Sequence, residues 1–187
     1  MTKNKTMLNL MCCLILSLMP VTSLCFAQQA DLKLKNNNSA DKIIQTYCNS
    51  DFNGARLSNK NYKESGIATI IIPGEGAEPG WDTATIVSGF RLLSTSPSGK
   101  GVKITVRYNV IGELDGASEF TKDNKTEDYV FHVKQVNNAW KLVNPDDLPP
   151  HISAETAIRH LEHLVKVQKE MRAENLKTIK KLKEIKK

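Results

Sequence analysis

The stretch EDYVFHVKQVNNAWKLVNP (residues 127–145) decides the fold class of this chain. Its first ten residues are rich in aromatic and β-branched side chains around a single histidine, His132, which is typical of a β-strand. Asn137-Asn138 predicts a tight hairpin turn, because asparagine tolerates the backbone conformation that such turns need. The chain then returns beside the first strand until Pro145. The stretch therefore predicts a hairpin that closes a curved antiparallel sheet.

Further strands are expected before this hairpin. Residues 82–96 form a long β-type run, and Gly89 in its interior predicts a bulge or sharp bend. Residues 102–110 alternate cleanly, as a half-buried strand does. The β-branched run at residues 66–73 is expected to be a short strand, and residues 113–125 a polar connection.

Helices are expected at both ends of this β-rich region. Residues 40–50 place apolar side chains, including Cys48, on one helical face, so we expect that thiol to be buried. Ser153 caps a second helix, whose signal continues to Lys187. As one straight helix it would be about 52 Å long, so the part beyond Val165 is expected to project. The predicted fold is α+β, with an N-terminal helix packed in a curved antiparallel sheet and a long C-terminal helix.

The N-terminal residues resemble a targeting segment. Lys3 and Lys5 precede an apolar run, and Ala27 offers a small residue for cleavage, as in a secretory signal peptide. We therefore expect residues 1–27 to be removed and the protein to be periplasmic or secreted. Residues 28–39 are expected to be a flexible leader, residues 40–165 the domain, and residues 166–187 a basic helical tail.

The net charge of +6 is concentrated at the C-terminus. The tail holds nine basic and three acidic residues, whereas residues 28–165 hold 15 basic and 17 acidic residues. The domain therefore has no basic footprint for nucleic acid, and no nucleic-acid partner is expected. Of the four cysteines only Cys48 follows the predicted cleavage site, so no internal disulfide is expected.

Four stretches together resemble a known superfamily. ADKIIQTYCNSDFNGARLS, EPGWDTATIVSGF, VKITVRYNVIG and YVFHVKQVNNAWKLVNP are similar to the nuclear transport factor 2-like (cystatin-like cone) superfamily, and in particular to its exported bacterial members of unknown function. The resemblance covers residues 40–164. It implies a conical pocket between helix and sheet, and dimers through the outer sheet face. The superfamily includes isomerases, dehydratases, polyketide cyclases and non-catalytic binding domains, so the fold does not settle the function.

No catalytic residue is carried over from this resemblance. Catalytic members use an aspartate, or an Asp–His pair, at the pocket floor, and no such motif aligns with this chain. His132 is the most visible candidate base, but it shares its strand face with Lys134 rather than with the aromatic side chains. We therefore expect His132 to lie on the outer face of the sheet.

Asp82 is the second candidate, as a carboxylate at the mouth of an apolar cone. It could act as an acid or base with Tyr108, whereas the structural alternative is that Trp81 plugs the cone and Asp82 caps the strand entry. Five aromatic side chains could line a ligand pocket, although aromatic residues in strands usually belong to the core. These pocket candidates are Trp81, Tyr108, Tyr129, Phe131 and Trp140.

A metal or cofactor is not expected. His160 and His163 share a helical face and His151 lies nearby, but a metal site needs three or four convergent ligands. The glycine-rich segments lack the spacing of a phosphate-binding loop.

The basic tail allows three interpretations. It could be a solvated helix, it could contact anionic lipid or an acidic protein, or it could self-associate as a coiled coil. The expected contact residues are Lys169, Arg172, Lys177, Lys180, Lys181 and Lys183. The coiled-coil seam would comprise Leu161, Leu164, Gln168, Met171, Asn175, Thr178, Leu182 and Ile185.

The sequence predicts an exported, non-catalytic binding domain, with a tail for self-association or contact with an acidic surface. A homodimer through the outer sheet face or the tail would fit this interpretation. One alternative is an enzyme that uses the cone for proton transfer on a small molecule, as an isomerase or dehydratase does. A second alternative is a structural subunit of an envelope assembly.

Overall fold

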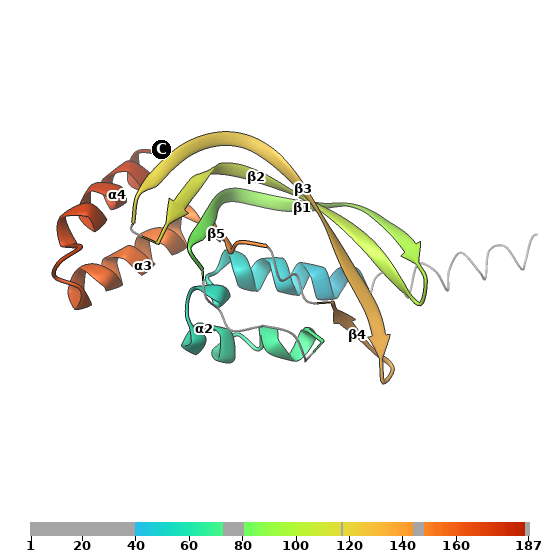
Figure 1. Cartoon of the computed structure of the whole chain (residues 1–187). Coiled ribbons are helices and arrows are strands. Elements are labelled where there is room, and N and C mark those ends of the chain that lie inside the picture. The colour runs from blue at the N-terminus through green and yellow to red at the C-terminus, as the bar shows by residue number, and fades with distance from the viewer. Residues whose placement is uncertain (1–39, 73–80, 117, 144–147, 186–187) are drawn as a thin grey trace, which may run out of the picture. The chain divides into compact units, whose positions relative to one another are not determined.

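A strongly curled sheet arches over a helix of residues 40–52 (Figure 1). The computed structural model describes residues 40–72, 81–116, 118–143 and 148–185. The predicted signal peptide and leader lie outside these residues. The described residues confirm the α+β class, with helices at both ends of a β-rich region.

The sheet has five strands in the order β4-β3-β2-β1-β5. The strands are β1 Thr83–Ser98, β2 Gly101–Asp115, β3 Phe120–Val136, β4 Ala139–Leu142 and β5 His151–Ser153. The first four pair antiparallel, whereas β5 pairs parallel with β1, so the sheet is mixed. The predicted hairpin at Asn137-Asn138 is confirmed, and both asparagines have positive φ values of 50° and 62°.

Irregularities in strand pairing accompany the curl of the sheet. The β1–β2 register shifts between Ile86 and Val87, and again between Val87 and Gly89. Such bulges bend a strand and increase its local twist. The bend predicted at Gly89 is therefore confirmed. Strands β2 and β3 approach closely at Gly112, where a Cβ atom would lie 2.2 Å from the Thr121 carbonyl oxygen.

The helix of residues 40–52 fills the concave face of the sheet. Its buried apolar side chains include Ile44 and Cys48, and they join a core with Ile104 and Val106 from β2. Tyr47 packs edge-to-face against Phe131 of β3, with ring centroids 5.5 Å apart. Cys48 is 1% exposed, which confirms its predicted burial.

Two predicted elements differ from the structure. Most of the β-branched run expected to be a strand forms the 3-10 helix η2 (Ile67–Ile70), which follows Gly66 in a left-handed conformation at φ 71°, and Ile71 alone makes a β-bridge, to Leu142. Burial of Ile67 under the sheet thus outweighs β-propensity. Most of the polar connection expected at residues 113–125 belongs to strands β2 and β3, because Leu114 and Phe120 pair and are buried.

Short helices connect the N-terminal helix to β1. These are η1 (Ala55–Leu57) and α2 (Asn59–Glu64), which precede η2. Ser58 caps α2 by accepting a hydrogen bond from the Asn61 amide at 3.1 Å. No helix among the described residues is long and apolar enough to cross a membrane.

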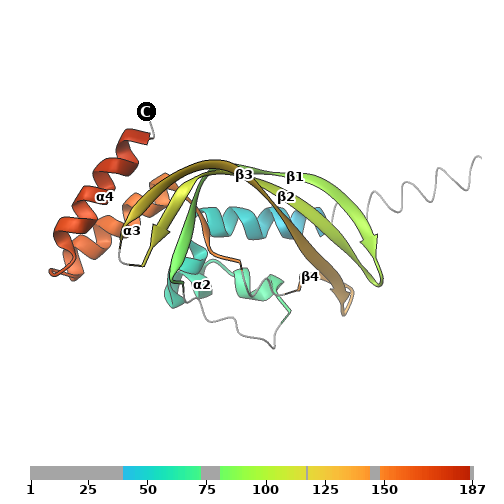
Figure 2. The ribbon, with the colours of Figure 1, turned by 45° about the horizontal axis from the view of Figure 1, so that its top comes forward.

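The C-terminal region forms two helices rather than one. Helix α3 (Ala154–Val167) begins at the predicted cap Ser153, whose hydroxyl accepts from the Thr156 amide at 3.0 Å. Helix α4 (Arg172–Ile185) follows a turn and lies beside α3 at the end of the sheet (Figure 2). The prediction of a projecting helix is therefore wrong.

Helix α4 belongs to a second core. Ile179 and Leu182 are buried with Leu161 of α3 and with apolar side chains of the sheet, which include Ile86 and Leu114. Asn175, Thr178 and Leu182 of the predicted coiled-coil seam are buried, but against their own chain. Of the other predicted seam residues, Leu161 is buried as well, whereas Gln168 is exposed in the turn between the two helices.

Candidate functional site

A cluster of buried polar side chains lies between the N-terminal helix and the sheet. Its members, here called the buried polar cluster, are Tyr47, Cys48, Asp51, Tyr108 and His151, together with the partly exposed Arg56 at its margin. The helix of residues 40–52 supplies the first three, and β2 and β5 supply Tyr108 and His151. Buried polar groups of this density require mutual hydrogen bonds, because each unpaired one costs free energy.

Asp51 is the buried carboxylate of this cluster. Its side chain is fully buried, and Oδ2 accepts a hydrogen bond from the His151 backbone amide at 2.8 Å. The guanidinium of Arg56 lies 3.6 Å from the same oxygen, whereas Oδ1 has no hydrogen-bond partner among the described residues. Burial raises the pKa of the Asp51 carboxyl to about 6, and Arg56 and the His151 amide only partly offset this effect. Burial therefore outweighs the ion pair.

Arg56 connects the cluster to the segment that enters β5. Its guanidinium donates to the Tyr47 hydroxyl at 3.1 Å and to the Pro149 carbonyl at 3.4 Å, and it also contacts the Leu148 carbonyl. A planar guanidinium has several donors in fixed directions, so one side chain can hold all these acceptors. Arg56 thus fastens residues 148 and 149 to the N-terminal helix.

His151 packs against two tyrosine rings. Its ring centroid is 4.1 Å from that of Tyr108 and 5.1 Å from that of Tyr129. Nδ1 lies 2.8 Å from the Pro149 carbonyl oxygen, which can only accept, so Nδ1 carries the proton. Nε2 is buried without a partner among the described residues. Burial lowers the pKa of His151 to about 4, so the ring is neutral at pH 7.

Cys48 and Tyr108 form a buried pair. The Cys48 Sγ atom lies 3.1 Å from the Tyr108 hydroxyl oxygen. Burial raises the pKa of the Cys48 thiol to about 12, and it also raises the pKa of Tyr108. A thiol that stays protonated is a poor nucleophile. This chemistry favours a structural role for Cys48.

The cluster has the chemical groups of an acid–base site, but these groups are not accessible to a substrate. A neutral imidazole with a free Nε2 lone pair and a carboxyl with a raised pKa are typical of general acids and bases. However, Asp51 and Tyr108 are 0% exposed and His151 is 1% exposed. Burial of this degree leaves a substrate no direct path to these groups.

Asp82 and Tyr108, the residues of the enzyme alternative, lie far apart. Asp82 is exposed just before β1, and its backbone carbonyl accepts from the Gly116 amide at 2.7 Å. Tyr108 pairs with Phe90, further along the same ladder. At about 3.3 Å per residue the eight positions from Asp82 to Phe90 correspond to roughly 26 Å along the strand.

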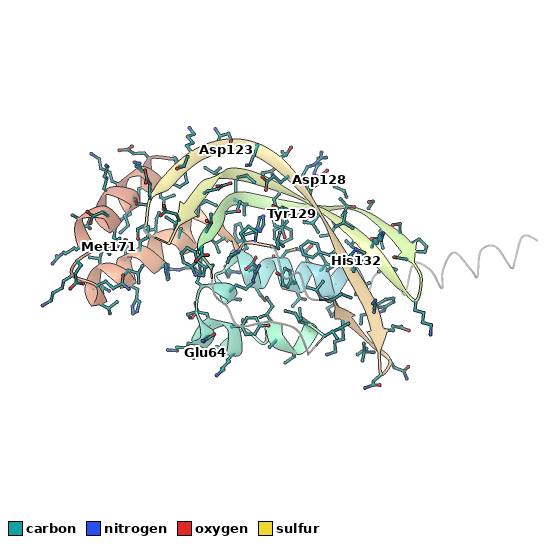
Figure 3. All side chains as sticks on the ribbon, in the orientation of Figure 1. Glu64, Asp123, Asp128, Tyr129, His132 and Met171 are labelled. Carbon is teal, nitrogen blue, oxygen red and sulfur yellow. The ribbon has the colours of Figure 1, made fainter. Side chains whose placement is uncertain are left out.

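The aromatic pocket candidates divide between the two cores. Tyr108, Tyr129 and Phe131 belong to the concave face, with Tyr129 beneath the arch of β3, and Trp140 packs at the margin of the same core (Figure 3). Trp81 belongs to the second core, where its indole donates to the Leu57 carbonyl at 3.3 Å. The five residues therefore do not line one pocket.

His132 lies on the exposed face of β3, as predicted. It pairs with Lys103 of β2 and shares its face with Lys134. The same outer face carries Asp128, which accepts two hydrogen bonds of 2.7 Å from Arg107. This face therefore combines charged pairs with an exposed valine, Val130, which is 53% exposed.

We expect replacement of His132 by alanine to change the free energy of unfolding by less than about 0.5 kcal/mol. Its side chain is exposed and accounts for no buried contact. His151→Ala is the matched comparison and is expected to cost much more, because that ring is stacked and buried. Urea unfolding of both variants measures the difference, and equal losses would contradict the assignment.

The histidines of the C-terminal region do not converge. The His160 ring packs against Trp81 at a centroid distance of 5.7 Å, whereas His151 belongs to the buried polar cluster. Among the described residues no group of three or more metal-ligating side chains comes together.

Known proteins offer no guide to this site. No family model, curated protein or solved structure matches the chain. The function must therefore follow from the geometry of the chain itself.

Sequence reasoning missed Asp51, Arg56 and His151 as a group. One signal was present: Asp51 falls on the apolar face of the N-terminal helix, four residues after Tyr47. A carboxylate on such a face predicts a buried partner. That partner is Arg56, which follows a turn at Gly54. Gly54 has φ 90°, and a Cβ atom added there would lie 2.7 Å from the Thr156 methyl carbon.

Asp51 and His151 should make opposite contributions to the pH dependence of stability. Because the pKa of Asp51 is raised in the folded state, the contribution of this group to the free energy of unfolding is lost as the pH rises from about 4 to 6. Because the pKa of His151 is lowered in the folded state, the contribution of this group to the free energy of unfolding is gained as the pH rises from about 4 to 6.5. The two effects should largely cancel in the native protein.

The substitution Asp51→Asn should reveal this cancellation, because the variant keeps only the contribution of His151. As the pH rises from about 4 to 6, the native protein should lose stability relative to the variant, by at most about 1.4 kcal/mol per pH unit. Urea unfolding of both proteins across this range measures the difference. A difference that does not change with pH would show that Asp51 keeps an ordinary pKa.

Proposed function

We propose that this protein is an exported, non-catalytic interaction domain. The observation that carries the proposal is the filled interior: apart from Arg56, every member of the buried polar cluster is at most 1% exposed, on the concave side of the sheet. Chemistry on a small molecule would need an open chamber there. The surface is therefore the functional part of the molecule.

The basic face of the C-terminal helices supports contact with an anionic lipid surface. Helix α4 exposes Arg172, Lys177, Lys180 and Lys183, and Leu176 between them is 50% exposed. Lysines beside an exposed apolar side chain suit a lipid surface, because the apolar side chain can insert among the lipids while the ammonium groups contact anionic headgroups. Not all the expected contact residues are equally available, since Lys181 is half-buried and directed at the Phe120 carbonyl.

Vesicle binding tests this surface directly. The purified chain should co-sediment with phosphatidylglycerol vesicles and not with phosphatidylcholine vesicles. Since a lysine near such a surface contributes about 1 kcal/mol, Lys177→Ala with Lys180→Ala should weaken binding roughly 30-fold. The matched control replaces Lys100 and Lys103, which are also exposed but lie in the β-sheet region.

Results that contradict lipid contact can be told apart from one another. Equal binding to both vesicle types, or equal losses in both double variants, would contradict lipid contact through α4. Binding to a soluble acidic polymer without vesicle binding would instead point to an acidic protein partner.

We also propose that the chain belongs to the nuclear transport factor 2-like superfamily. A helix lying in the concave face of a strongly curled sheet supports this assignment. The filled interior would make it a member whose cone serves as a core. An experimental structure compared with known members tests the proposal, and a different strand order would contradict it.

A further inference from the structure

The turn between α3 and α4 lacks the residues that usually end a helix. It consists of Gln168, Lys169, Glu170 and Met171, with neither glycine nor proline. All four are good helix formers, and none of them has a positive φ. The local sequence therefore favours a continuous helix, and the observed turn depends on the docking of α4 against its own chain.

The docking of α4 combines apolar contacts with specific polar ones. Leu182 is 0% exposed and Ile179 is 5% exposed. The Thr178 hydroxyl donates to the Ser118 carbonyl at 2.5 Å, and Lys183 Nζ lies 3.1 Å from Glu162 Oε1 of α3. These contacts define one receiving surface for α4, formed by α3, by Ser118 and by the apolar side chains of the sheet in the second core.

Asn175 weakens this docking. It is 0% exposed, and neither its amide nitrogen nor its amide oxygen has a hydrogen-bond partner among the described residues. A buried polar group without a partner opposes the packed state. Release of α4 from its own receiving surface is therefore easier than the buried leucine and isoleucine alone would suggest.

We propose that two copies of the chain exchange α4. Residues 168–171 become helical, α3 and α4 join into one helix of about 48 Å, and α4 docks on the receiving surface of the second copy. Every docking contact is kept, and only the turn changes, as in domain swapping. Val167 and Leu176, which are 59% and 50% exposed on either side of the turn, gain apolar contacts where the two straightened segments pass.

The exchange of α4 is independent of lipid contact, because lipid contact needs only one copy of the chain. It also gives the predicted self-association of the tail a definite geometry. The receiving surface is the one already seen in the structure, so the partner is a second copy of the same chain.

Cross-linking between isotopically distinct chains tests the exchange. Lys183 and Glu162 are close enough for carbodiimide to join them without a spacer. The full chain is prepared in light and heavy isotopic forms, mixed unfolded, refolded at high concentration and separated by size. In the dimer fraction, mass spectrometry should find Glu162–Lys183 peptides that combine a light and a heavy chain. A dimer whose linked peptides are all of one isotope, or a chain that stays monomeric at its solubility limit, would overturn the proposal.

Substitutions in the turn provide the second test. Lys169→Gly with Glu170→Gly should weaken the dimer about 100-fold, because glycine disfavours the straightened helix in both chains. Lys169→Ala with Glu170→Ala removes the same charges but keeps helix formers, so it should leave the dimer intact. Sedimentation equilibrium measures both constants. Equal weakening in the two variants would show that charge, and not helix continuity, holds the dimer.

Discussion

Replacing Arg56 with leucine is expected to lower the free energy of unfolding by roughly 3–5 kcal/mol at neutral pH or above, because the substitution leaves a buried carboxylate without its cation. Asp51 is fully buried, and Arg56 is its ion-pair partner at 3.6 Å. The substitution also removes the donors to the Leu148 and Pro149 carbonyls. Urea unfolding at about pH 8 is the appropriate measurement, since the pKa of Asp51 is about 6 and the carboxyl is then ionised.

The pH dependence of this loss identifies its cause. Below the pKa of Asp51 the carboxyl is protonated, so removal of Arg56 should cost less at about pH 5 than at pH 8. Addition of Asp51→Asn to the Arg56 variant should recover part of the stability at pH 8. Arg107→Leu is the matched control, because that arginine makes a bidentate pair on the solvated face. A loss no greater than that of Arg107→Leu would contradict the assigned role.

Replacing Leu182 with alanine is expected to lower the free energy of unfolding by about 2–5 kcal/mol, the usual range for a leucine removed from a packed core. Its side chain is 0% exposed within the second core, although it belongs to a region that the sequence describes as a basic tail. Thermal or urea unfolding measures the loss at a low chain concentration, where exchange of α4 between copies is suppressed.

Leu176 provides a control of the same chemistry on the same helix. It is 50% exposed, so Leu176→Ala should change stability by less than about 0.5 kcal/mol. Two leucines six residues apart thus distinguish a docked helix from a projecting one. Similar small effects for both would mean that α4 does not pack on the domain in solution.

Much of the β-sheet follows from local sequence. The alternation in residues 102–110 and the aromatic and β-branched run in residues 127–136 predicted two strands that the structure contains. Asn137-Asn138 predicted the hairpin between β3 and β4. These features depend on side chains within a few residues of one another, which is the range over which periodicity carries information.

Features that depend on distant contacts were not predictable in this way. The strand β5 has only three residues and exists because it pairs with β1, far earlier in the chain. The turn at residues 168–171 contradicts its own helix propensity and reflects the docking of Leu182. The buried polar cluster likewise joins Asp51 to a residue one hundred positions away, through the His151 amide.

The parallel pairing of β5 with β1 also sets an order of assembly. Strands β1, β2 and β3 are joined by short turns and can zip together from neighbouring segments as the chain emerges. Ile152 can take its place beside Ile86 only when a loop of more than sixty residues has closed, so this pairing is expected to follow the antiparallel ladder. The closing of a long loop is slow compared with hairpin formation. His151 should therefore enter the core last, and until then Asp51 and Arg56 face water, where neither charge is costly.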